Sequence, residues 1–145
     1  MNKRSIISWL FIATALVLGV IFLLKIDFPV GLEPYFQKTY YGQFGPLAIS
    51  IELLLAGFYL YRKHPKTNFA LALFGFTALL DPLFNFAGFF VSNMPIYGTV
   101  IFSACAIVAL WIALSNSFSL KKISLVTVFV SFVLGVIVEL FFNYL

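Results

Sequence analysis

The chain has 145 residues, of which 63% are apolar, 19% aromatic and 10% charged, and its mean hydropathy is +1.08. Soluble domains contain about 45–50% apolar and about 25% charged residues, so this composition excludes a soluble monomer and indicates an integral membrane protein. The net charge of +4 does not point to nucleic acid as a partner, because the basic residues form short clusters between apolar runs.

Five apolar runs are each about 20 residues long, which is the length that crosses about 30 Å of hydrocarbon as a helix. The predicted helices are, in chain order, Ser5–Leu24, Phe44–Tyr61, Asn68–Val91, Pro95–Ser115 and Ser124–Tyr144. We expect an all-α, polytopic membrane protein in which residues 1–145 form a single domain, a bundle of five transmembrane helices. Helices that follow one another in the sequence are expected to be neighbours in the bundle.

The longest connection between predicted helices, Lys25 to Gln43, carries several Phe and Tyr residues among polar ones. Aromatic side chains of this kind favour the boundary between membrane and water, where the ring is in an apolar region and a hydroxyl stays hydrated. We expect this connection to form an interfacial loop on the outer surface of the membrane.

The basic residues predict the orientation of the bundle. Seven of the nine fall on the same side of the predicted membrane: Lys3, Arg4, Arg62, Lys63, Lys66, Lys121 and Lys122. The other side receives only Lys25 and Lys38, which are offset by two acidic residues. By the positive-inside rule we expect the N-terminus in the cytoplasm and the C-terminus outside, in a plasma or inner membrane.

Three of the five acidic residues, Glu52, Asp81 and Glu139, fall within predicted helices. An ionised carboxylate at the centre of a membrane helix costs about 2.5–3.5 kcal/mol on insertion scales, so such residues tend to face the protein interior, to pair, to hold a proton or to bind a cation. At about 1.5 Å of rise per residue, all three lie roughly 8–15 Å from the outer helix ends. We expect one carboxylate cluster in the outer half of the bundle.

Small and polar residues accompany the acids at helical spacing. The last predicted helix has such a residue at every fourth position: Thr127, Ser131, Gly135, Glu139 and Asn143. A stripe of this kind stays on one side of a helix, so we expect it to face the bundle while the large apolar residues face lipid. Ordinary helix packing also uses small-residue stripes. The polar side chains expected to support the acids are Asn85, Ser103 and Asn143.

The preferred hypothesis is an outward-facing pocket at Glu52, Asp81 and Glu139 that binds a cation, a proton or a cationic solute and serves transport or sensing. No cofactor is evident beyond such a bound cation, and the sequence assigns no metal. The acids would alternatively pair with Lys25 or Lys38, or stay protonated and hydrogen-bond to the supporting residues.

The rival hypothesis is a non-catalytic accessory or structural subunit of a larger membrane complex, in which the acids bond between helices or face a basic residue of a partner. An enzyme with Asp81 and Glu139 as acid and base is less favoured, because the sequence lacks nucleophile and metal motifs such as GxSxG and HExxH. The expected partners are the lipid bilayer and either a homo-oligomer or the larger complex.

Overall fold

The computed structural model describes residues 3–26, 28, 30–33, 43–88, 94–116, 118 and 123–143, with the side chain of residue 143 excepted. Within these residues the chain forms five helices: α1 (Lys3–Leu24), α3 (Phe44–Arg62), α4 (Thr67–Ala87), α5 (Ile96–Ser115) and α6 (Leu125–Asn143). All five are long and apolar enough to cross a membrane. The predicted all-α membrane bundle is therefore confirmed. The interfacial loop expected between Lys25 and Gln43 lies largely outside the described residues.

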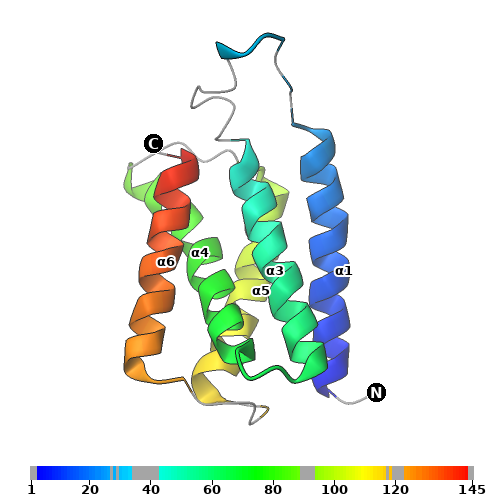
Figure 1. The fold of residues 1–145 in the computed structure, drawn as a ribbon, viewed down its shortest axis with the longest axis vertical. Helices are drawn as coiled ribbons and strands as arrows, with labels where there is room; N and C mark the ends of the chain where they lie inside the picture. The colour runs from blue at the N-terminus through cyan, green and yellow to red at the C-terminus, as the bar shows by residue number, and fades with distance from the viewer. Residues whose placement is uncertain are drawn as a thin grey trace.

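The helices lie side by side in the order α6, α4, α3 and α1, and α5 packs behind them against α4 (Figure 1). The bundle has α1 beginning at one end and α6 finishing at the opposite end (Figure 1). One expectation about neighbours is wrong. The last helix packs against α4 and more lightly against α3, rather than along α5, which precedes it in the sequence. This placement makes α4 the central helix, in contact with α3, α5 and α6.

The helix boundaries follow the prediction within a few residues except at the end of α4. This helix finishes at Ala87 rather than at Val91. Gly88 follows it with a φ of 88°, and its N–H donates to the carbonyl of Asn85 at 3.3 Å. A residue in this left-handed conformation ends a helix, and glycine adopts it without steric cost, so Gly88 was the stop signal in the sequence.

A basic side chain ties the start of α1 to the end of α3. Arg4 donates through Nη1 to the carbonyls of Leu60 and Tyr61, at 2.7 and 2.6 Å. Carbonyls in the last turn of a helix have no intrahelical donor and carry the negative end of the helix dipole, so a guanidinium stabilises them. This contact fixes two helix ends at the same level of the bundle.

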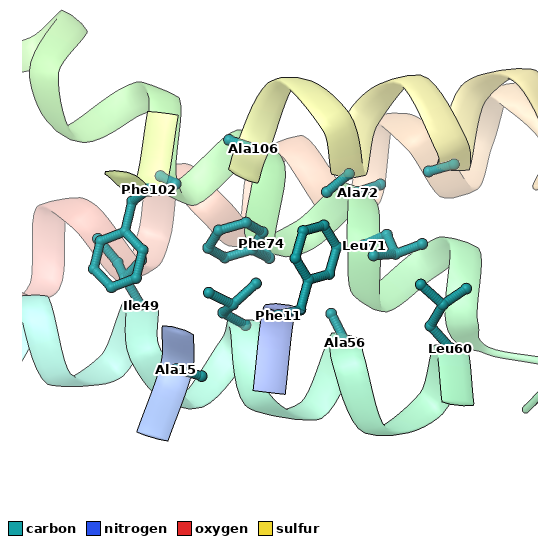
Figure 2. Packing of buried hydrophobic residues seen from close by; sticks show 14 of the residues in the cluster. Phe11, Ala15, Ile49, Ala56, Leu60, Leu71, Ala72, Phe74, Phe102 and Ala106 are labelled. Atoms are coloured by element: carbon teal, nitrogen blue, oxygen red, sulfur yellow. The ribbon is translucent and has the colours of Figure 1, made fainter. Parts of the chain in front are cut away.

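The apolar core is built by α1, α3, α4 and α5 (Figure 2). Phe11, Ile49, Phe74 and Phe102 come together from these four helices, and the rings of Phe74 and Phe102 meet edge to face at 6.1 Å. Among the described residues, this core includes no side chain from α6. The last helix is therefore held to the bundle by other contacts.

Candidate functional site

The buried face of α6 is made of small and polar residues. Ser131 and Gly135 are buried, and Glu139 keeps only 2% of its surface exposed. The large apolar side chains of the same helix point outward, with Phe129 66% and Ile137 56% exposed. A helix in water would bury the opposite face, so this arrangement suits a helix whose outer face contacts lipid tails. The predicted stripe faces the bundle at Ser131, Gly135 and Glu139.

Gly135 sets how closely α6 approaches α4. A Cβ atom on this residue would lie 3.1 Å from Oγ1 of Thr77 and 3.2 Å from its backbone nitrogen, closer than ordinary van der Waals contact. The two helices begin at the same end of the bundle and run in the same direction (Figure 1). Asp81 and Glu139 each lie one turn beyond the point of contact. The close approach therefore brings these two carboxyl groups to one level.

Asp81 and Glu139 form a buried carboxyl pair. Their side chains are 4% and 2% exposed, and they share a hydrogen bond. An ionised carboxylate only accepts hydrogen bonds, so two carboxyl groups bond to each other only when at least one of them carries a proton. The geometry of the pair is therefore that of two acids sharing one proton.

Glu52 reaches the same region from α3. Its side chain is hydrogen-bonded to Thr77 and lies close enough to Glu139 to interact electrostatically. The Thr77 hydroxyl donates its single proton to the carbonyl of Leu73 at 2.8 Å. The hydroxyl of Thr77 therefore lies between the carbonyl of Leu73 and the carboxyl group of Glu52. Its second oxygen, Oε2, is buried without a hydrogen-bond partner.

The structure thus brings Glu52, Asp81 and Glu139 together at the junction of α3, α4 and α6. It adds Thr77, which the sequence places one turn before Asp81 on the same helix face but which was not assigned to the site. Thr77 belongs to the acid cluster only because α3 places Glu52 beside it, within hydrogen-bonding distance of its hydroxyl.

The residues expected to support the acids lie in different places. Asn85 is one turn beyond Asp81 on α4, and its side chain is exposed. Ser103 is partly buried on α5, next in sequence to Phe102 of the apolar core. The side chain of Asn143 lies outside the described residues. Lys25, considered as a counter-charge for the acids, instead donates to the hydroxyl of Tyr97 at 2.7 Å.

The cluster does not have the geometry of a metal centre. Within the part of the chain that the structure describes, no three His, Cys, Asp or Glu side chains are arranged to hold a metal ion. Two cavities border α1 and α3, and neither is lined by Glu52, Asp81 or Glu139. Asp81 is bonded to Glu139 and Glu52 to Thr77, and the first of these contacts suits a proton.

Comparisons with protein-family models, with curated proteins and with solved structures found no match. The chain is a membrane bundle of helices with a buried carboxyl pair between α4 and α6, and its function is inferred from these residues and their geometry.

Proposed function

We propose that this protein binds a proton between Asp81 and Glu139 and uses the bound proton to control how α6 packs against α4, as a proton-responsive membrane protein. The observation that carries the proposal is the hydrogen bond between two carboxyl groups that are 4% and 2% exposed. Such a bond contains a proton that the surrounding pH can remove.

The chemistry of the cluster favours a proton over the other cations considered. Asp81 and Glu139 are bonded to each other directly, whereas a bound metal ion requires oxygen ligands to surround it. A cationic solute requires a cavity, and the acids do not line either of the cavities described beside α1 and α3. A proton needs no space beyond that of the hydrogen bond.

Loss of the proton would act directly on α6. Two ionised carboxylates in a region of low dielectric repel each other and can no longer hydrogen-bond. The described contacts of α6 with α4 include the close approach at Gly135, the bond of Glu139 to Asp81 and the ring contact of Phe132 with Phe76. Deprotonation would remove the bond at Glu139 and so weaken the contact of α6 with α4.

The orientation inferred from the basic residues would place the pair in the half of the membrane nearer the outside. Asp81 lies six residues before the end of α4, and Glu139 lies four residues before the end of α6. These positions correspond to depths of about 9 and 6 Å below the helix ends. With the N-terminus in the cytoplasm, the pair would exchange protons with the outer medium.

Infrared spectroscopy of the carboxyl C=O stretch tests the proposal. In the parent protein we expect absorption from protonated carboxyl groups that persists at neutral pH, and the part of it that belongs to the pair should disappear in Asp81→Asn and in Glu139→Gln. Glu33→Gln is the matched control, because Glu33 is exposed and lies outside the helices. If every carboxyl band is lost on raising the pH through about 4, as for exposed acids, the pair does not hold a proton and the proposal fails.

The accessory-subunit hypothesis predicts a different result from the same variants. In that case the parent protein would show no proton-linked change. Asp81→Asn would instead reduce co-purification of a partner or of a homo-oligomer. The exposed apolar residues of α6 suit lipid and a partner helix equally. Measuring oligomeric state across the same pH series therefore separates the two functions.

A further inference from the structure

A cavity lies at the end of the bundle opposite the N-terminus, between the end of α1 and the beginnings of α3 and α5. Its volume is about 210 Å³, and it is lined by Phe22, Lys25, Ile26, Gln43, Pro46 and Pro95. It is separate from the carboxyl pair, since no acid of the pair lines it. Of its lining residues only Lys25 is charged.

The ammonium group of Lys25 is held in place by an aromatic residue. Nζ donates to the hydroxyl of Tyr97 at 2.7 Å and lies 5.1 Å from the centre of the same ring, while that ring stacks on Phe22. Both contacts that the ammonium makes with described residues are to Tyr97, which is neutral. The positive charge is therefore oriented without being neutralised by this contact.

The backbone adds positive potential around the same cavity. Gln43 and Pro95 are the N-cap residues of α3 and α5, and neither makes a side-chain cap hydrogen bond. The first turns of both helices also lack acidic residues. Helix N-termini carry unsatisfied N–H groups and the positive end of the helix dipole, so both favour an anion near Lys25.

An apolar groove runs along the surface of α1 and α3. Its volume is about 180 Å³, and it extends from Leu23 to Ala15 on α1, a length of about 12 Å. Phe22 borders the cavity and the next residue, Leu23, borders the groove; the same holds for Pro46 and Leu47 on α3. The cavity that contains Lys25 and the upper part of the groove therefore lie at the same level of the same two helices.

We propose that the cavity and groove together bind an anionic phospholipid, with its phosphate beside Lys25 and one acyl chain along the groove between α1 and α3. The charge of Lys25 favours a phospholipid with a net negative charge over a zwitterionic phospholipid. In a zwitterionic lipid the ammonium group of the headgroup already neutralises the phosphate. The groove supplies apolar contact for the chain.

Native mass spectrometry of the intact protein tests this site. The protein is equilibrated in detergent with phosphatidylglycerol or with phosphatidylcholine of the same chain composition. We expect phosphatidylglycerol to be retained preferentially, and Lys25→Gln to weaken its retention about tenfold, the change expected from loss of one charge-assisted hydrogen bond. Lys66→Gln removes the same charge at the opposite end of the bundle and should leave retention unchanged.

The acyl-chain part is tested by a second pair of variants. Leu16 lines the groove, and the adjacent Val17 does not. Leu16→Trp should obstruct the groove and weaken phosphatidylglycerol retention, whereas Val17→Trp should not. Melting temperature and circular dichroism confirm that each variant remains folded.

Three results would overturn the proposal. Equal retention of the two lipids removes the charge selection, and equal losses in Lys25→Gln and Lys66→Gln show that only net charge matters. Thermal protection by soluble glycerol phosphate equal to that by phosphatidylglycerol identifies a free-phosphate site instead of a lipid site.

Discussion

At the scale of single residues, the properties of the site depend on hydrogen-bond capacity. Asp81 and Glu139 share a bond that requires a proton, and the Thr77 hydroxyl lies between the carbonyl of Leu73 and the carboxyl group of Glu52. The unpartnered Oε2 of Glu52 is tolerated more readily on a neutral acid than on a carboxylate, because burying an unpaired charge is far more costly.

The first prediction concerns Asp81→Asn. Under the proposed function, the closed contact between α4 and α6 holds a proton that the opened state releases at neutral pH, so the stability of the parent protein should fall as pH rises. An asparagine at position 81 donates an N–H to an ionised Glu139 without needing that proton. We expect the free energy of unfolding of the variant to depend less on pH than that of the parent protein. The difference in slope should be up to that of one proton, about 1.4 kcal/mol per pH unit.

The measurement is the melting temperature in detergent across a pH series, followed by tryptophan fluorescence. Glu33→Gln should retain the slope of the parent protein. Identical slopes in the parent and in Asp81→Asn would show that the pair takes up no proton on closing.

The second prediction compares two substitutions along the path from Thr77 to Glu52. Thr77→Val keeps the shape and removes the hydroxyl, and we expect a loss of about 1 kcal/mol, typical of a hydrogen bond between membrane helices. Glu52→Gln keeps a neutral group that can donate, and its effect should be smaller. Chemical unfolding in detergent measures both, with Thr127→Val as control near the start of α6. A larger loss for Glu52→Gln than for Thr77→Val would indicate that Glu52 is ionised.

At the scale of helices, α6 differs from the others in how it is attached. Most of its large apolar residues face outward, and its contacts with α4 include those at Gly135 and Glu139 and the ring of Phe132, which meets Phe76 edge to face at 5.5 Å. The other helices share the apolar core. Close backbone approach, a polar bond and one aromatic contact therefore hold α6.

The third prediction uses two glycine-to-alanine substitutions. Gly135→Ala places Cβ 3.1 Å from Oγ1 of Thr77, so α6 must move away from α4, at a cost of about 1–3 kcal/mol. Gly19→Ala places Cβ 3.6 Å from Cβ of Ser50, an ordinary contact, and alanine favours a helix by roughly 0.5–1 kcal/mol. The first should destabilise the protein and accelerate hydrogen exchange in α6, while the second should be neutral or stabilising. Equal effects would show that the approach at Gly135 is not limiting.

At the scale of the whole molecule, the odd number of described membrane helices places the start of α1 and the end of α6 at opposite ends (Figure 1). The bonds from Arg4 to the last turn of α3 bring basic residues of α1 and α3 to the same end, with Lys66 beginning α4 there as well. By the positive-inside rule this end is predicted to face the cytoplasm.

The fourth prediction is that this basic end is cytoplasmic. In a variant with Cys105→Ala, a cysteine introduced by Glu33→Cys should react with an impermeant maleimide added to intact cells. A cysteine introduced by Lys66→Cys should react only after the membrane is opened. The reverse pattern would place the N-terminus outside and would give the carboxyl pair access to the cytoplasmic half.

Much of the architecture could be read from the sequence, because its signals are local. Helix length follows from apolar runs, and the stripe through Ser131, Gly135 and Glu139 stays on one face because its spacing of four is close to the helical repeat. The inward direction of the acids followed from the cost of exposing a carboxylate to hydrocarbon. The end of α4 was predicted too late although Gly88 marks it, because the apolar run continues beyond Gly88 in the sequence.

The sequence by itself therefore determined the membrane class, the helices and the side of α6 that faces inward, since each depends on residues close together in the chain. The tertiary structure alone decided that α6 lies on α4 instead of α5, and hence that Glu139 bonds to Asp81 and that Thr77 bridges to Glu52. The physical reason is that side-chain bonds between helices depend on which neighbours meet and at what level, and that choice is made by packing, here by the close approach at Gly135.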